Sequence, residues 1–304
     1  MAAQLRAVRQ RIRAVQSIGK ITRAQELIAS SRIIRAQQRM REAEPYAREL
    51  TRAVEAVVSR SGTIEHPLVS EPESSSRAAV LVLTSDSGFA GAFNTNILRE
   101  EQRLSGLLGE RRVEPVPFVA GRKGIGWHRA RQIEMAQTWS GFSARPQVRD
   151  ATEITNSLLE AFEKPAADGG VDEIFMVRTE FVSMLTQRPV VTRLLPLEIE
   201  ESTDEPSGGP LPNYEFEPST ETVLDRLLPQ YVEGRIFYAM LEAAASELAS
   251  RRRAMKAATD NANDLVERLT REANNARQAE ITQEISEIVG GANAMADANA
   301  ARSE

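Results

Sequence analysis

The sequence predicts an α/β domain with a mainly parallel, Rossmann-like sheet, combined with a long antiparallel coiled coil formed by the N- and C-terminal helices. Two observations lead to this fold class. Both ends of the chain carry apolar or small residues at alternating spacings of three and four, which is typical of a coiled-coil seam. Between the ends, short apolar runs alternate with helical stretches, as expected for parallel strands with helices on both faces of the sheet.

The N-terminal helix is predicted over residues 3–59, a length of about 85 Å at about 1.5 Å per residue. Gly19, Thr22 and Glu26 weaken its seam in the middle, because they are small or polar. Pro45 removes one backbone donor and is expected to kink or bend the helix. The seam comprises Leu5, Val8, Ile12, Val15, Gly19, Thr22, Glu26, Ala29, Ile33, Ala36, Met40, Ala43, Ala47, Leu50, Val54 and Val57.

This first helix is basic, whereas the rest of the chain is acidic. Residues 1–40 contain nine Arg and Lys and one acid, a net charge of +8, in a chain whose net charge is −5. A basic arm on an acidic protein favours an acidic partner, either protein or nucleic acid. No apolar run approaches the roughly 20 residues of a membrane helix. The basic N-terminus is interpreted as part of the mature fold, because its periodicity continues without a cleavage site.

The middle of the chain is predicted to be the α/β domain, bounded by two loop-like stretches. Residues 61–76 read as a linker and residues 201–218 as a second loop, with an edge strand expected around Tyr214–Phe216. The strand candidates are residues 78–85, 113–121, 172–181 and 190–199, and the helical stretches include Thr95–Leu108 and Ala151–Lys164. The predicted domains are residues 1–60, 61–76, 77–200, 201–218 and 219–304.

The C-terminal helix occupies most of residues 219–304, and Pro229 is expected to break it early. Its seam then shifts phase at Ile281, which changes the supercoil locally. We expect Ile281, Ile285 and Ile288 to pack on the N-terminal helix. Before the shift, the seam comprises Leu241, Ala245, Leu248, Arg252, Met255, Thr259, Ala262, Val266, Leu269, Ala273 and Ala276.

The run LVLTSDSGFAGAFN (81–94) has the strand–turn–helix order of a phosphate loop. It lacks the three spaced glycines of the dinucleotide fingerprint and the Gly-Lys-Ser/Thr ending of a P-loop. The run GRKGIG (121–126) also falls short, because its glycine spacing is reversed. A turn in which Gly88 and Gly91 pack a helix onto the sheet is the favoured interpretation, and nucleotide binding is the alternative.

No other motif carries catalytic chemistry. The chain has no cysteine and only two histidines, His66 and His128, so neither a thiolate nor a histidine metal site is expected. Ser85 and Ser87 lack the nucleophile elbow and a triad histidine. The carboxylate pairs Glu284/Glu287 and Asp260/Asp264 have helical spacing and read as solvated or partner-facing surfaces. We therefore expect no catalytic residue, no cofactor and no metal.

Several motifs are specific to one family. The run ITQEISEIVGGANA (281–294) resembles the C-terminal signature of the γ-subunit family of F-type ATP synthases. The matching positions are Ile281, Thr282, Glu284, Glu287, Gly291, Ala292 and Ala294. Four other stretches and the Arg277–Gln278 pair resemble the same family in order along nearly the whole chain: RIRAVQSIGKIT (11–22), SDSGFAGAFN (85–94), EFVSMLTQRPVV (180–191) and MKAATDNA (255–262).

The resemblance implies a non-catalytic central stalk, whose rotation couples the c-ring to conformational changes in the catalytic β subunits during ATP synthesis. It implies a single copy among three α and three β subunits, contacts with the ε subunit and the c-ring, and a peripheral location on the cytoplasmic face of a bacterial membrane. It also implies contacts with the α and β subunits by Lys20, Arg23, Gln25, Arg277, Gln278 and Thr282. Gln25 departs from the family, because many relatives have methionine there.

Two other functions remain as alternatives to the rotor. The first is a nucleotide-using enzyme built on the α/β domain, which the incomplete glycine patterns disfavour. The second is a hinge-and-arm protein that binds DNA through its basic helix. The absence of aromatic residues among the arginines, and of a Walker motif, disfavours the second.

Overall fold

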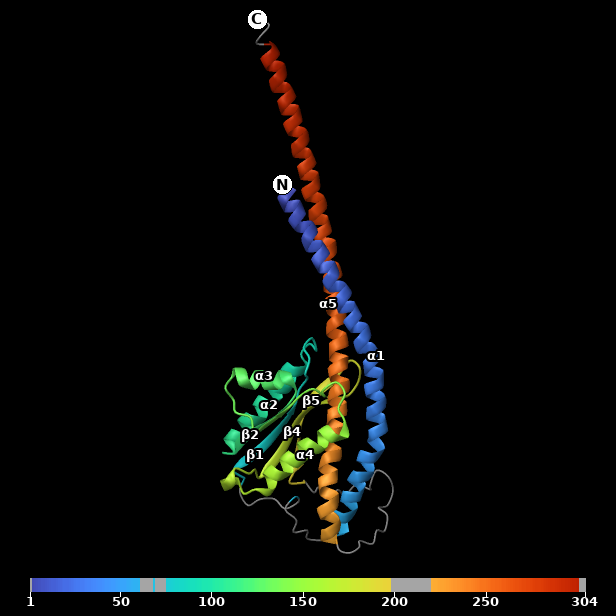
Figure 1. Cartoon of the computed structure of the whole chain (residues 1–304), viewed down its shortest axis with the longest axis vertical. Helices are drawn as coiled ribbons and strands as arrows, with labels where there is room; N and C mark the ends of the chain where they lie inside the picture. Colours follow the sequence, from blue (N-terminus) through green and yellow to red (C-terminus); the bar gives the residue numbers. More distant parts are fainter. Residues whose placement is uncertain (1, 61–67, 69–74, 198–219, 301–304) are drawn as a thin grey trace. The chain divides into compact units, whose positions relative to one another are not determined.

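The computed structural model describes residues 2–60, 68, 75–197 and 220–300 (Figure 1). The predicted linker, the loop at 201–218, the edge strand at Tyr214–Phe216 and His66 lie outside these residues, except for Leu68 and residues 75–76. The chain divides into two compact units, Met1–Ile28 with Arg253–Glu304, and Ala29–Arg252. Each unit is described separately.

The first unit is an antiparallel pair of helices, formed by the start of α1 (Ala2–Arg60) and the end of α5 (Thr220–Ala300). Leu5 and Val8 are buried in one cluster with Leu269 and Ala273. Further along α1, the Thr22 hydroxyl lies 2.8 Å from that of Thr259. Residue numbers along α1 increase from Leu5 to Thr22, while those of the facing residues in α5 decrease from Ala273 to Thr259. The two helices therefore run antiparallel, which confirms the predicted coiled coil.

The predicted seams agree with the observed burial up to Ala276. All sixteen predicted positions of α1 are buried or partly buried. On α5, every predicted position from Leu241 to Ala276 except Arg252 is buried or partly buried as well. The weak centre of the seam is filled by the Thr22–Thr259 contact and by Gly19, where an added Cβ would lie 3.5 Å from the Ala262 side chain.

Two expectations about α5 are wrong. The helix does not break at Pro229, because Leu224, Leu228 and Val232 are almost fully buried around it and their packing outweighs one missing hydrogen bond. The residues Ile281, Ile285 and Ile288 do not pack on α1, since they are 43%, 56% and 71% exposed.

The second unit contains a five-stranded sheet of order β3-β2-β1-β4-β5. Its strands are β1 (Arg77–Leu83), β2 (Glu114–Ala120), β3 (Gln137–Trp139), β4 (Glu173–Phe181) and β5 (Gln187–Leu195). The first four strands are parallel, whereas β5 pairs antiparallel with β4. The mainly parallel Rossmann-like sheet is therefore confirmed, and β3 is an additional strand that the apolar pattern did not predict.

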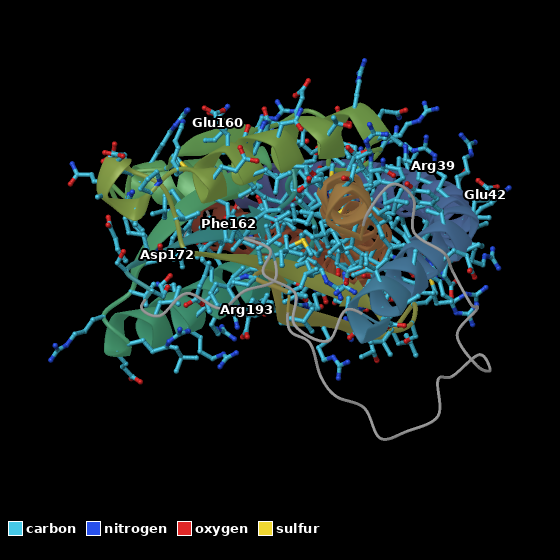
Figure 2. All side chains as sticks on the ribbon, turned by 90° about the horizontal axis from the view of Figure 1, so that it is seen from below. Arg39, Glu42, Glu160, Phe162, Asp172 and Arg193 are labelled. Carbon is cyan, nitrogen blue, oxygen red and sulfur yellow. The ribbon has the colours of Figure 1, made fainter. Side chains whose placement is uncertain are left out.

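Helices cover both faces of this sheet. The helices are α2 (Phe93–Glu110), α3 (Arg122–Ala130) and α4 (Val148–Glu163), with a 3-10 turn at Ala166–Asp168. The sheet separates α2 from α4 and α5, and Phe162 of α4 points inward while Glu160 lies on its outer side (Figure 2). The core joins β1 to Ile97 of α2, Ile154 of α4 and Ile236 of α5, each fully buried. Because β1 is buried along nearly its whole length, the loop that follows it is held at a fixed edge of the sheet.

Candidate functional site

The first candidate site is the carboxyl edge of the sheet, where an open α/β fold binds its ligands. The loop after β1 meets the start of α3 there. The Thr84 hydroxyl donates to the Ala120 carbonyl at 2.8 Å and accepts from the Gly124 amide at 2.9 Å. A Cβ on Gly121 would lie 2.3 Å from the Thr84 carbonyl oxygen, and one on Gly124 would lie 2.7 Å from the Thr84 hydroxyl oxygen. The GRKG segment therefore serves close packing of α3 on the end of β1.

Asp86 takes the place that a phosphate would need. Its carboxylate accepts hydrogen bonds from the backbone amides of Arg122, Gly141 and Ser143, at 3.2, 2.8 and 3.0 Å. The Arg122 amide belongs to the first turn of α3, and a helix N-terminus of this kind is where α/β folds bind phosphate. The fixed carboxylate of Asp86 already satisfies these donors and repels a second anion.

The space beside this loop is too small for a nucleotide. A cavity of about 20 Å³ is lined by Thr84, Phe142, Ser143 and Glu247, among others. One water needs about 10–15 Å³, whereas ligand pockets measure about 300–1,000 Å³. Met240, Ala243 and Glu247 of α5 line this cavity on one side.

Ser85 and Gly91 have structural roles at this edge, whereas Gly88 lacks the expected one. Ser85 is fully buried, and its hydroxyl donates to the Ser87 carbonyl at 2.8 Å, so it is not presented as a nucleophile. Gly91 has a φ of 56°, which a turn requires. The expected packing role is wrong for Gly88, since a Cβ there would make only ordinary 3.5 Å contacts with the Lys123 side chain.

A buried ion pair that the sequence did not reveal links α2 to α3. His128 is fully buried, with Nε2 2.6 Å from the Glu101 carboxylate and Nδ1 2.9 Å from the Gly124 carbonyl. Burial lowers the pKa of His128, but the hydrogen bond and charge of Glu101, with the Gly124 carbonyl, outweigh it and raise the pKa above its ordinary value. Local sequence gives His128 no partner, because Glu101 lies 27 positions earlier on another helix.

The second candidate site is the exposed surface of the coiled coil. Lys20, Arg23 and Gln25 are exposed on α1. Arg23 donates to Glu26 at 2.7 Å, and Glu26 is largely buried in the seam. The pair explains how the seam tolerates an acid at this position. Arg23 nevertheless keeps 57% of its side chain exposed, so its charge faces outward.

Gln25 lies within a second apolar stripe of α1 that the sequence analysis missed. Ile18, Ile21 and Ile28 are 54%, 62% and 44% exposed. With Gln25 they follow spacings of three and four, so they share one face of the helix next to the seam. The signal was present in the sequence as isoleucines one position before the seam residues. Exposed isoleucines in a row indicate a surface that a partner covers.

Arg277, Gln278 and Thr282 lie on the part of α5 beyond Ala276, and all three are exposed. The Thr282 hydroxyl donates to the Gln278 carbonyl at 2.9 Å within the helix. The same stretch of α5 also exposes four apolar residues: Ile281, Ile285, Ile288 and Val289. We call residues 277–292 the tip of α5. Arg277 lies about 27 Å along the helix from Thr259, which faces Thr22, so the structure keeps the two sets of predicted contact residues apart.

No helix of the described part of the chain has the length and apolar character needed to cross a membrane.

Comparisons with known proteins agree on one family. The ATP synthase family profile matches residues 4–295. The ATP synthase gamma chain of Thermobifida fusca is 56% identical over 303 residues, covering 99% of both chains. The ATP synthase gamma chain of Acidothermus cellulolyticus is 57% identical over 295 residues, covering 97% of this chain and 98% of the relative.

Solved structures share the fold at low sequence identity. A chain from the central stalk and c-ring of Tetrahymena thermophila mitochondrial ATP synthase has a TM-score of 0.57 and 20% identity, over 78% of this chain and 99% of that chain. A chain from the rotor of Euglena gracilis mitochondrial ATP synthase has a TM-score of 0.64 and 14% identity, over 92% of this chain and 100% of that chain. The likeness extends over the long helices as well as the sheet.

Proposed function

This chain belongs to the ATP synthase gamma-chain family, and from that premise we infer that it is the central-stalk subunit of an F-type ATP synthase. The observation that carries this inference is the antiparallel coiled coil together with two sets of exposed isoleucines, in the apolar stripe of α1 and at the tip of α5. Nothing in the described chain covers them. A shaft enclosed by other subunits needs such a surface. A free-standing enzyme or binding domain would leave the same residues in water without benefit.

We propose that the chain itself is non-catalytic and that ATP chemistry takes place on the β subunits. Asp86 at the start of α3 and the small cavity beside it support this proposal. Both features occupy the place where an α/β domain would hold a nucleotide. The chain then acts through its contacts alone.

We propose that one copy of the chain assembles with three α and three β subunits, with ε and with the c-ring. The c-ring holds the assembly at the cytoplasmic face of a bacterial membrane. The exposed apolar stripe of α1 and the tip of α5 support contacts with a surrounding ring of subunits. The structural neighbours come from the central stalk and the rotor of mitochondrial ATP synthases, which supports the same assembly.

Within this assembly, Lys20, Arg23 and Gln25 form one contact surface and Arg277, Gln278 and Thr282 form another. The net charge of +8 over residues 1–40 suits acidic segments of the β subunits. The faces of the shaft differ in charge and in apolar character. Rotation therefore presents a different surface to each of three otherwise equal catalytic sites, and such differential contacts shift their conformational equilibria.

Reconstitution tests this function directly. Purified α and β subunits are combined with and without this chain, and ATP hydrolysis and the mass of the native complex are measured. The proposal predicts one copy per three α and three β subunits and a gain of rotation-coupled activity. A complex that excludes the chain, or activity that does not change when it is added, contradicts the proposal.

A further inference from the structure

The helix α5 makes a directional polar contact with the α/β domain close to the end of the second unit. Arg251 lies one position before Arg252, the last residue of that unit. Its guanidinium donates to the backbone carbonyls of Ser87 and Gly88, at 3.3 and 3.3–3.4 Å. Both carbonyls belong to the loop after β1, which the core holds in place. Arg251 therefore connects α5 to the rigid edge of the sheet.

Buried neighbours fix the guanidinium of Arg251 in this position. Glu247, one turn earlier on α5, accepts from Arg251 at 2.6 Å and is 1% exposed. The Ser143 hydroxyl hydrogen-bonds the Glu247 carboxylate and accepts from the Asp86 amide at 2.9 Å. Asp86 belongs to the loop after β1, Ser143 to the loop after β3 and Glu247 to α5, so one network joins both loops to α5.

Two further polar contacts join α5 to the sheet near this level: Glu242 pairs with Arg178 of β4, and the Ser250 hydroxyl donates to the Gln187 side chain of β5 at 3.2 Å. Other contacts at this level are apolar. Ala245, Leu248 and Ala249 are buried against α1, and Phe181 of β4 and Met184 of the β4–β5 connection pack beside them. Small aliphatic side chains give packing that is favourable but non-directional. Packing of this kind opposes turning or sliding of the helix only weakly. The bonds of a planar guanidinium to two carbonyls and a carboxylate are directional and oppose such a movement.

We propose that Arg251 and the Ser87–Gly88 carbonyls form a joint that fixes the rotational position of α5 against the loop after β1, beside the Arg178–Glu242 and Ser250–Gln187 contacts with β4 and β5. The proposal rests on the central-stalk function and assigns a mechanical role to the loop that follows β1. Torque generated on α5 passes through this joint to the α/β domain, and torque from the α/β domain passes back. Without the joint, α5 twists more easily against the loop after β1, and part of each rotation is lost in that twisting.

The test uses the assembled membrane-bound complex with Arg251→Lys and, as a matched control, Arg252→Lys. Lysine keeps the charge beside Glu247 but cannot bond the carboxylate and both carbonyls with one planar fork. Arg252 is the adjacent exposed arginine, so the control has the same chemistry on the neighbouring position. Ions pumped per ATP hydrolysed are measured at equal amounts of assembled complex. We expect Arg251→Lys to lower this ratio at least twofold and Arg252→Lys to leave it unchanged.

A cross-linking experiment separates a joint from a general effect on folding. The chain has no cysteine, and Gly88 has room for a Cβ, so Arg251→Cys and Gly88→Cys can be introduced together. The same preparation is measured before and after treatment with a short thiol-reactive cross-linker. We expect the pumping ratio to be low before treatment and to recover after it, with a matching fall in the angular fluctuations of a probe on the α/β domain.

Two results would overturn the joint. One is an equal pumping ratio for Arg251→Lys and Arg252→Lys in a complex whose wild-type form pumps. The other is a cross-linked complex that regains neither pumping nor stiffness. A wild-type complex that fails to rotate contradicts the central-stalk function itself, so the two failures are distinguishable.

Discussion

The tip of α5 gives a prediction whose size follows from exposure. Ile285 and Ile288 are 56% and 71% exposed. Fully burying an isoleucine contributes about 1.5–3 kcal/mol, so covering the exposed parts of both contributes about 2–4 kcal/mol to assembly. We expect the double variant Ile285→Gln/Ile288→Gln to bind the α–β ring about 30- to 1,000-fold more weakly. Glutamine forms helices at least as well as isoleucine, so the lone chain should change by less than about 0.5 kcal/mol.

Two measurements on the same variant check this prediction. Thermal unfolding followed by circular dichroism reports the stability of the lone chain, and fluorescence anisotropy of labelled chain titrated with the ring reports assembly. Leu269→Ala is the control, because Leu269 is 4% exposed in the seam and its truncation should cost the lone chain about 2–5 kcal/mol. The reasoning is refuted if the double variant assembles as tightly as the wild type, or if it destabilises the lone chain as much as Leu269→Ala does.

Three further predictions concern the α/β domain and the contact surfaces. The raised pKa of His128 means that its pair with Glu101 stabilises the fold fully below the unfolded pKa of about 6.5. That stability is lost as the pH rises through the higher folded pKa. The free energy of unfolding, measured with urea at several pH values between 6 and 8, should therefore fall with increasing pH, and His128→Gln should remove this decrease. The same decrease in the His128→Gln variant would contradict the prediction. Gly121→Ala should cost at least about 2 kcal/mol, because Gly121 has a φ of 102° and no room for a Cβ. Gly126→Ala should raise the free energy of unfolding by up to about 1 kcal/mol, because nothing lies within 4 Å of the added Cβ in α3. Equal unfolding temperatures for the Gly121→Ala and Gly126→Ala variants would contradict this prediction. Replacing Arg277 and Gln278 by alanine should weaken coupling or assembly while the lone chain melts unchanged, and melting at a clearly lower temperature would instead indicate a structural role.

Local periodicity was sufficient to predict the long helices and four strands. A coiled-coil seam repeats every few residues, so Leu5, Val8 and Leu269 could be assigned to it without knowledge of the partner helix. The run that forms β1 is apolar throughout, as expected for a strand buried on both faces. In these cases the preference of each residue agrees with the tertiary environment, which is the condition under which sequence patterns succeed.

The missed elements depend on contacts that are distant in the sequence. The strand β3 has three residues, too few to show a period. The helix α3 contains Gly124 and Gly126, which have low helix propensity, and its start depends on packing against Thr84. Pro229 was expected to break α5, and burial of its neighbours prevented it.

The register of the coiled coil explains the error at the tip of α5. Thr22 faces Thr259, and each step back along α1 is a step forward along α5. The described part of α1 begins at Ala2 and reaches Leu5 in the cluster that holds Ala273, with Ala276 packed beside it. Ile281 and the residues after it lie past that point. The phase shift at Ile281 was visible in the sequence, but the register, in which no described residue of α1 faces Ile281, was not.

As a central stalk, the chain is a shaft that turns rather than a domain that binds a nucleotide. Single-molecule observation tests this most directly, with the α–β ring fixed to a surface and a probe attached to the α/β domain of this chain. We predict that ATP drives continuous rotation of the probe in one direction, with pauses at three equivalent angles. Steady ATP hydrolysis by the same complex without rotation of the probe would contradict the account.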